Sequence, residues 1–175
     1  MKARYVVDTN VLIAASAADP THPKDIDATP TDPALRLRVW GWLEEFRSSA
    51  ARLVLDSDLR IYEEYTNKLG FNDFGLQVVM HKWSTAATDD VAVEYDAEGH
   101  GVLPVSLAPV IHDLADRKMV AAALGAAQTI GVAPIAFAGD TDWHGWENHL
   151  LRHGVELEPL IEEWSRSKFA EKKSR

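Results

Sequence analysis

The fold is decided by the stretch YVVDTNVLIAASAA, residues 5–18. Residues 5–7 form a short apolar, mostly β-branched run that stops at Asp8, and residues 10–18 have the composition of a helix. A short apolar run that leads directly into a helix is typical of a buried strand in a parallel sheet. The chain therefore opens with a strand and a helix, and Asp8 stands at the carboxyl end of the strand.

The same alternation of strand and helix continues along the chain. Apolar runs predict further strands at residues 53–55, 91–95 and 135–137. Apolar residues at helical spacing predict helices at residues 33–51, 59–69, 74–83, 116–127 and 142–153, followed by an edge strand and a helix within 155–161. Strands that alternate with helices pair in parallel through right-handed crossovers. We therefore expect an α/β fold, a three-layer α/β/α sandwich with a central, mostly parallel sheet.

We expect one domain over residues 1–161. Four prolines mark residues 19–33 as an inserted loop or mobile flap, and Asp32 is placed to cap the helix that follows. Ser57 or Asp58 is expected to cap the helix at residues 59–69. Residues 162–175 are basic and are expected to form a frayed tail.

Composition narrows the class of protein. The 175 residues are 46% hydrophobic and 26% charged with no cysteine, which is typical of one globular domain and excludes disulfides and thiolate chemistry. The net charge of −9 argues against strong nonspecific binding to nucleic acid, but gathered metal-binding carboxylates also produce an acidic balance. No stretch approaches the ~20 apolar residues of a membrane span, so we expect a cytoplasmic protein with no membrane partner.

Three aspartates stand where chemistry is expected. Asp8 and Asp140 each follow an apolar strand, and open parallel sheets bind ligands in the crevice beyond the strand ends. Asp116 lies three and four positions before Met119 and Val120, on the buried stripe of its helix. Each aspartate is also a good helix N-cap, and capping alone explains each one equally well when it is taken singly.

A shared crevice would bring these acids together with a glutamate. Glu63 and Glu64 both lie within the helix at residues 59–69, and helical spacing does not choose between them. Carboxylates gathered from several elements repel one another severely unless a cation neutralises them. Oxygen ligands without cysteine favour Mg²⁺ or Mn²⁺, and such a cluster is typical of enzymes that activate a water against a phosphodiester.

Four segments, in this order, resemble the four motif regions of PIN domains, which are metal-dependent nucleases. They are VVDTNVLIAA (6–15), IYEEY (61–65), HDLADRKMVAAAL (112–124) and FAGDTDWHGW (137–146). The resemblance implies a quartet of catalytic, metal-binding acids, with Glu64 preferred to Glu63 because it directly precedes Tyr65. The quartet is Asp8, Glu64, Asp116 and Asp140. The resemblance also implies Asp142 as an auxiliary metal ligand and Asn10 as a polar residue that steadies Asp8.

The activity implied by the resemblance is that of an Mg²⁺- or Mn²⁺-dependent endoribonuclease, which hydrolyses single-stranded RNA through a metal-activated water. Arg117 and Lys118, directly beside Asp116, are the best-placed residues to contact the RNA backbone. Trp143 and Trp146 are candidates for stacking on an unpaired base.

The biological setting has three alternatives. The first is the toxin of a toxin–antitoxin pair, with a small antitoxin protein as partner. The second is a free-standing RNA-processing nuclease. A homodimer is expected for either nuclease. The third alternative, from another class of protein, is a non-catalytic module that binds Mg²⁺ and a partner.

Overall fold

The computed structural model describes residues 1–22 and 26–175 of the chain. Within these residues there are five strands, which are β1 (Arg4–Val7), β2 (Arg52–Asp56), β3 (Thr88–Val91), β4 (Ile135–Phe137) and β5 (Leu157–Pro159). They form one sheet in the order β3-β2-β1-β4-β5, and each neighbouring pair is parallel.

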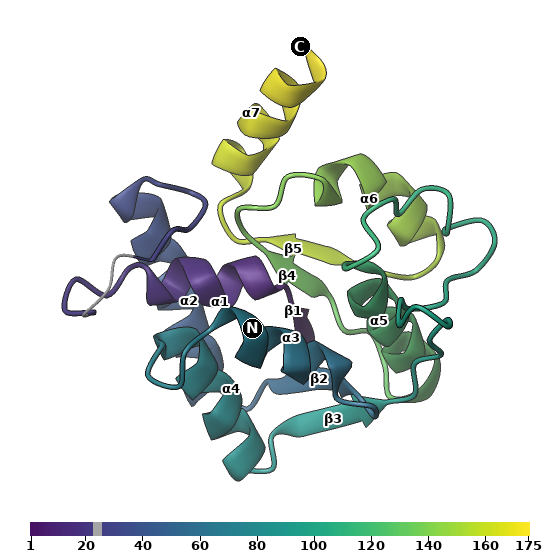
Figure 1. Ribbon diagram of the computed structural model, residues 1–175, viewed down its shortest axis with the longest axis horizontal. Coiled ribbons are helices and arrows are strands. Elements are labelled where there is room, and N and C mark those ends of the chain that lie inside the picture. Colours follow the sequence, from purple (N-terminus) through teal and green to yellow (C-terminus); the bar gives the residue numbers. More distant parts are fainter. Residues whose placement is uncertain (23–25) are drawn as a thin grey trace.

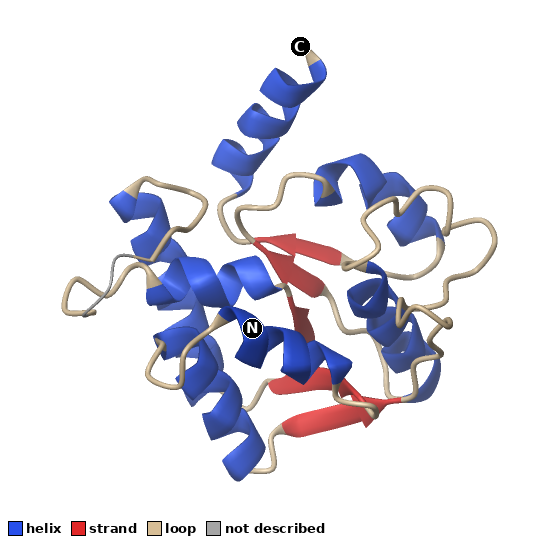
Figure 2. Ribbon diagram, in the orientation of Figure 1, coloured by secondary structure: helices blue, strands red, loops and turns tan. Residues whose placement is uncertain are grey.

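Helices cover both faces of this sheet. The described residues contain α1 (Thr9–Ser16), α2 (Pro33–Ser48), α3 (Arg60–Lys68), α4 (Phe74–Ser84), α5 (Arg117–Thr129), α6 (Trp143–Arg152) and α7 (Glu162–Lys173). Helices α1, α2 and α4 pack together on one face, and α5 and α6 lie on the other (Figure 1). Colouring by secondary structure makes the three layers plain (Figure 2). The expected α/β/α sandwich is confirmed, and its sheet is wholly parallel.

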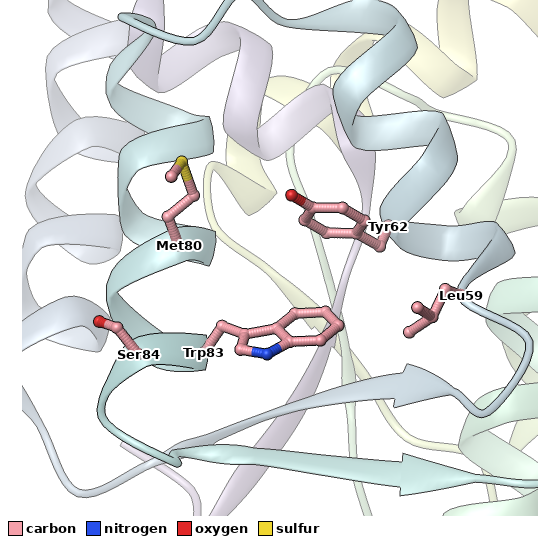
Figure 3. Close-up of a pocket in the computed structure, with 5 residues that line it drawn as sticks. All are labelled: Leu59, Tyr62, Met80, Trp83 and Ser84. Atoms are coloured by element: carbon pink, nitrogen blue, oxygen red, sulfur yellow. The ribbon is translucent and has the colours of Figure 1, made fainter.

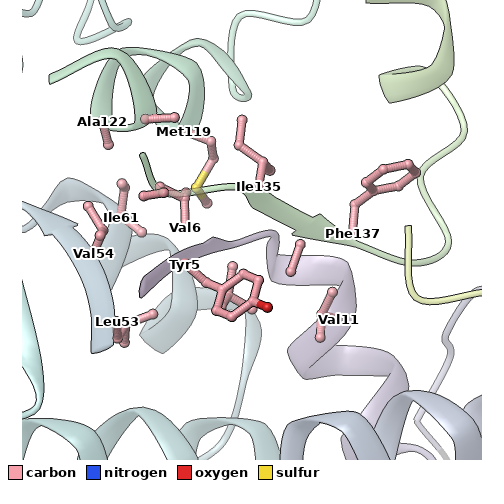
Figure 4. Close-up of a cluster of buried hydrophobic side chains, with 14 of the residues drawn as sticks. Tyr5, Val6, Val11, Leu53, Val54, Ile61, Met119, Ala122, Ile135 and Phe137 are labelled. Atoms are coloured by element: carbon pink, nitrogen blue, oxygen red, sulfur yellow. The ribbon is translucent and has the colours of Figure 1, made fainter. Parts of the chain in front are cut away.

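The core lies on both sides of the central strands. Tyr5, Val6, Leu53, Val54 and Ile135 are fully or almost fully buried between the helix layers (Figure 4). Successive side chains of a strand point to opposite faces, so a strand covered on both faces is apolar at every position. Each buried aliphatic side chain of this kind stabilises the fold by about 1.5–3 kcal/mol.

The strand order reverses between β1 and β4. From β1 the chain crosses to β2 and then β3, and it returns past β1 to β4 and β5. Val6 and Val7 of β1 are paired with Ile135 and Ala136 of β4. In open α/β sheets the crevice at such a reversal, beyond the carboxyl ends of the strands, is the usual ligand site. Residues that follow β1 and β4 are therefore brought to this crevice.

The strand expected at residues 91–95 is displaced, because β3 occupies Thr88–Val91. It is an edge strand in which only Val91 is buried. Edge strands often carry polar residues, so this strand has no apolar run by which the sequence could indicate it. Asp89 accepts hydrogen bonds from Arg4 Nε at 3.1 Å and Arg52 Nε at 2.7 Å. Tyr95 instead forms an isolated antiparallel bridge with Gly101.

The expected cap of α3 is wrong. Neither Ser57 nor Asp58 caps the helix. Asp56, the last residue of β2, accepts hydrogen bonds from the backbone N–H groups of Arg60 at 3.0 Å and Ile61 at 2.8 Å. The cap lies further from the helix than usual because Leu59 adopts a left-handed conformation, with φ 60° and ψ 21°. Asp32 caps α2 as expected, through the backbone N–H of Ala34 at 2.8 Å.

The Pro-rich insertion at residues 19–33 is packed at its C-terminal half and is not a free flap there, and residues 23–25 of it lie outside the described residues. Ala28 and Pro30 are buried, and the Arg36 guanidinium donates to their carbonyl oxygens, each at 2.6 Å. A side chain at Gly139 would meet the Thr29 carbonyl oxygen at 2.2 Å. Glycine at this position therefore lets the insertion lie against the segment after β4.

The frayed tail expected at residues 162–175 is also wrong, because residues 162–173 form α7. The helix projects beside α6 and ends at the C-terminus (Figure 1). Its one fully buried residue, Ser165, lies 2.8 Å from Nε2 of the buried His144. The basic composition of residues 162–175 correctly indicated that most of this segment is exposed. An exposed segment can still form a helix when one of its turns, here that of Ser165, packs against the domain.

Candidate metal centre

Asp8 is an acid held almost out of solvent at the end of β1, and it is 3% exposed. Its carboxylate accepts from the backbone N–H of Asn10 at 3.3 Å and from Trp143 Nε1 at 3.1 Å. It is thus the N-cap of α1, as the capping explanation predicts. Burial, and next the charge of Asp140, raise the pKa of Asp8 to about 7. The two hydrogen bonds lower the pKa of Asp8, but burial and repulsion raise it by more.

Asp140 lies three residues beyond β4, next to Asp8 across the reversal of strand order. Its Oδ1 accepts from the backbone N–H of Asp142 at 2.9 Å. Burial raises the pKa of Asp140, and the charges of Asp142 and Asp113 add to this effect. Asp142 itself is half-buried, and its Oδ1 is paired with Lys172 Nζ at 2.5 Å. The structure thus brings Asp8 and Asp140 into electrostatic contact and places Asp142 beside them.

Asp116 precedes the first turn of α5 but makes no side-chain cap. Its Oδ2 is buried and has no hydrogen-bond partner among the described residues. Burial raises the pKa of Asp116 to about 9, and the charges of Asp8 and Asp140 contribute next. The capping explanation therefore fails for this aspartate. A buried carboxylate oxygen without a donor is costly, and a cation is one partner that would satisfy it.

Glu64 is the glutamate that faces the other acids. Its carboxylate accepts from the Thr9 hydroxyl, next to Asp8, and is paired with the Lys118 ammonium. Its charge also raises the pKa of both Asp8 and Asp116. Glu63 lies on the exposed side of α3. The geometry thus favours Glu64 over Glu63, a choice that helical spacing alone leaves open.

The chemistry of these donors fits a hard divalent cation. The carboxylates of Asp8, Glu64, Asp116 and Asp140 lie directly after β1, within α3, directly before α5 and after β4. They act on one another electrostatically, and all supply oxygen ligands. Among the described residues, no three of these four carboxylates have ligand atoms that all lie within 4.8 Å of one another. Coordination of one cation by three of them therefore requires their side chains to move closer together. We name these four residues, Asp8, Glu64, Asp116 and Asp140, the acid centre.

Two of the expected supporting roles receive structural explanations. The Arg117 guanidinium donates to the carbonyl oxygens of Ile111 at 3.0 Å and Ala108 at 2.7 Å, so it holds the preceding loop. Asn10 steadies Asp8 through its backbone N–H. Trp143 and Trp146 are 0% and 3% exposed, which excludes them as stacking platforms for a base.

A second group of possible metal ligands was absent from the sequence predictions. Asp96, Glu98 and His100 have ligand atoms within 4.8 Å of one another and could bind a metal ion. His100 Nδ1 lies 3.4 Å from Asp96 Oδ2 and 4.0 Å from Glu98 Oε2. Asp96 and Glu98 are exposed, and the loop is closed by Asp96 Oδ1, which accepts from two backbone N–H groups of its own turn. The D-x-E-x-H spacing was the available signal.

Two further charges near the acid centre were missed. Asp113 raises the pKa of both Asp116 and Asp140. Lys172 on α7 reaches Asp142 from the segment expected to be frayed, so no sequence pattern could indicate it. Lys118, in contrast, was expected beside Asp116 and is found paired with Glu64.

Comparisons with known proteins identify no family for this chain. No protein-family model, no curated protein and no solved structure matches it. In the described part of the chain, no helix combines the length and the apolar character needed to cross a membrane. The resemblance of the four motif segments to PIN domains therefore remains a prediction from the sequence. The acid centre is the structural observation that bears on function.

Proposed function

We propose that this protein is a divalent-metal-dependent nuclease that hydrolyses phosphodiester bonds in single-stranded RNA. The observation that carries the proposal is the buried Oδ2 of Asp116, which has no partner among the described residues, in a cluster where burial and the charges of nearby acids raise the pKa of three aspartates. Strongly shifted pKa values at a reversal of strand order are typical of a functional site. The RNA substrate class comes from the resemblance of the motif segments.

The acid centre would hold the cation. Mg²⁺ or Mn²⁺ bound there would supply Lewis acidity, which activates water and stabilises the charge that develops on the phosphate. Asp8 is oriented by Trp143 and by the first turn of α1, and Glu64 is oriented by the Thr9 hydroxyl. These contacts fix two carboxylates before any cation arrives.

Lys118 would contact the substrate in this proposal. Its ammonium is paired with Glu64 and also donates to the Ala115 carbonyl oxygen at 2.8 Å. If Glu64 served as a ligand of the cation, Lys118 would be available to a phosphate oxygen of the substrate. No side chain of the protein is needed as a nucleophile.

The test is cleavage of labelled single-stranded RNA by the purified protein, with Mg²⁺ or Mn²⁺ compared with EDTA. Asp8→Asn and Asp116→Asn are the matched variants, because each keeps the shape and removes the charge. We expect metal-dependent cleavage that falls at least 100-fold in both variants. A variant of the second acidic group, Asp96→Asn, should cleave like the wild type.

Cleavage that survives in Asp8→Asn and Asp116→Asn would come from a contaminant or another site and would end the proposal. A duplex and a single-stranded DNA of the same sequence, run in parallel, define the substrate class. The toxin setting, the antitoxin partner and the homodimer stay predictions of the resemblance. Growth arrest on expression, relieved by Asp8→Asn, is the outcome that the toxin setting requires.

A further inference from the structure

An open apolar pocket lies between α3 and α4, outside the acid centre. It has a volume of about 460 Å³, within the range of small-ligand sites. The residues that line it are Leu59, Tyr62, Met80, Trp83 and Ser84. Figure 3 shows Tyr62 from α3 and Trp83 from α4 converging across the pocket, with Leu59 at one end and Met80 at the other.

The pocket leaves large apolar surface in water. Trp83 is 42% exposed and Leu59 is 38% exposed. Leu59 also holds a left-handed backbone conformation, with φ 60°, which is strained for a leucine and which glycine or asparagine would adopt at lower cost. Strain of this kind is tolerated mostly at functional positions. The Leu59 side chain lies at the edge of the pocket.

The polar groups of the two rings narrow the choice of ligand. Neither the Tyr62 hydroxyl nor Trp83 Nε1 has a hydrogen-bond partner among the described residues. The ring centroids lie 5.2 Å apart with an interplanar angle of 60°, so a flat ligand stacks on the exposed face of Trp83 and does not enter between the rings. A purely aliphatic occupant would cover the Tyr62 hydroxyl without pairing it, which is costly. A planar heteroaromatic ring stacked on the indole has hydrogen-bonding edges that can pair with this hydroxyl, while Trp83 Nε1, which lies in the plane of the indole, stays open to water.

Position links this pocket to the acid centre. Tyr62 and Glu64 lie two residues apart on α3 and point to opposite sides of the helix, about 10 Å across. On the Glu64 side, Arg60, Lys68 and Lys118 line a second pocket of about 330 Å³, together with Glu63 and Glu64. Arg60 and Lys68 of α3 and Lys118 of α5 thus lie on the side of α3 next to the acid centre. Tyr62 of α3 and Trp83 of α4 lie on the other side. This is the complement of a nucleotide chain, whose phosphates are anionic and whose bases are flat.

We infer that the Tyr62–Trp83 pocket binds a nucleobase of the substrate, one or a few nucleotides from the scissile phosphate. The inference rests on the proposed function for the identity of the polymer. Stacking of a base on an aromatic side chain strengthens binding by roughly 5- to 150-fold. The pocket thus adds affinity for single strands, whose bases are free to turn out of the chain, and not for duplexes.

The test measures binding without cleavage. All proteins carry Asp140→Asn and are kept in EDTA, so that repulsion is reduced and no bond is cut. Binding of a labelled single-stranded RNA is followed by fluorescence anisotropy. We expect Trp83→Leu to weaken binding about tenfold, in line with the loss of one stacked base. Tyr62→Phe, which removes only a hydroxyl, should weaken binding about threefold.

Two controls sharpen the result. Leu151→Ala removes a side chain that is 62% exposed on α6 and should leave RNA affinity unchanged. An RNA with abasic positions should bind the parent and Trp83→Leu equally, because the partner of the indole is then missing. Thermal unfolding of each variant confirms that Trp83→Leu is folded.

Equal affinity of Trp83→Leu and its parent for intact RNA overturns the inference, and so does a parent that binds no RNA. A change in sedimentation on Trp83→Leu with unchanged RNA affinity also overturns it, because the pocket is then a protein interface. The proposed function fails separately. If RNA binding depends on Trp83 but wild type cleaves nothing with Mn²⁺, base binding stands and the nuclease is lost.

Discussion

The carboxyl ends of β1 and β2 carry the same residue in the same place, and the two aspartates have opposite surroundings. Asp56 at the end of β2 is fully buried and accepts three hydrogen bonds, from the backbone N–H groups of Arg60 and Ile61 and from the Tyr95 hydroxyl at 2.8 Å. Asp8, directly after β1, accepts two hydrogen bonds and interacts electrostatically with Asp140, Glu64 and Asp116. Asp116 has a buried oxygen that no donor among the described residues satisfies.

The comparison shows that the position of an aspartate at a strand end does not by itself indicate a metal site. The number of hydrogen-bond donors that reach its carboxylate distinguishes a structural cap from a candidate metal ligand. Buried polar groups in native proteins are nearly always satisfied, so a shortfall needs an explanation such as an absent ion. Asp56 is a structural cap and needs nothing further. The acid centre lies where the strand order reverses, so acids from several elements meet with few amide donors between them.

The largest effect on stability that we expect from a single substitution is at Asp56. Asp56→Ala removes the cap of α3 and leaves the Tyr95 hydroxyl unpaired, and we expect a loss of about 3 kcal/mol in the free energy of unfolding. Chemical denaturation at pH 8 without metal measures it. Asp58→Ala, an exposed neighbour, should change stability by less than about 0.5 kcal/mol. A similarly small effect of Asp56→Ala would remove the distinction between the two strand ends.

The second prediction concerns pH. The pKa of Asp8 is raised to about 7 and that of Asp116 to about 9, above the ordinary value of an unfolded aspartate. At neutral pH the folded, metal-free protein thus holds protons that the unfolded chain has released. The stability from these groups is complete below about pH 4 and is lost as pH rises through 7 and 9.

We therefore expect the free energy of unfolding of the metal-free protein to fall between pH 5 and pH 9, by about 1.4 kcal/mol per pH unit for each aspartate that only the folded state keeps protonated. Urea denaturation across this range in EDTA measures it. Asp116→Asn should flatten the curve above pH 7. Stability that rises with pH over this interval would contradict the description of the acid centre.

The sequence predicted the parts of the molecule that local pattern controls. Strands β1, β2 and β4 are continuous apolar runs, and the helix of residues 74–83 is recovered as α4. Glu64 was chosen over Glu63 by resemblance, and the structure explains the choice through Thr9 and Lys118. The sequence pattern alone could not distinguish an aspartate that only caps a helix from one in the acid centre. The distinction depends on how many hydrogen-bond donors other elements supply to the carboxylate.

Other features depend on distant contacts and carry no local signal. The edge strand β3 is polar because Arg4 and Arg52 pair with it across the sheet. Helix α7 is anchored by Ser165 against His144 from another helix. Arg117 looked like a phosphate contact beside Asp116, but its acceptors are carbonyl oxygens up to nine residues earlier.

The third prediction separates the neighbours Arg117 and Lys118. Arg117→Ala should lower the free energy of unfolding by about 2 kcal/mol, because two loop carbonyls lose charged donors, and should leave the salt dependence of RNA binding unchanged. Lys118→Ala should weaken RNA binding about fivefold and reduce the salt slope by about one. Anisotropy titrations at several salt concentrations measure both. The reverse pattern would assign the substrate contact to Arg117.

The smallest effect is expected at Lys172. Its ion pair with Asp142 joins an ammonium that is 62% exposed to a carboxylate that is 26% exposed. Pairs of this kind contribute little, so Lys172→Ala should change stability by less than about 0.5 kcal/mol. Thermal unfolding at low and high salt measures it. A loss above about 1 kcal/mol would mean that this pair, and not Ser165, docks α7.

The central claim is that a divalent cation binds at the acid centre, and Mn²⁺ binding followed by electron paramagnetic resonance tests it most directly. The chain offers its own control, because the exposed group of Asp96, Glu98 and His100 is the competing candidate. We expect Asp8→Asn and Asp116→Asn to abolish tight Mn²⁺ binding while Asp96→Asn leaves it unchanged. Binding that is lost in Asp96→Asn and kept in Asp8→Asn and Asp116→Asn would place the metal on the surface loop and contradict the account.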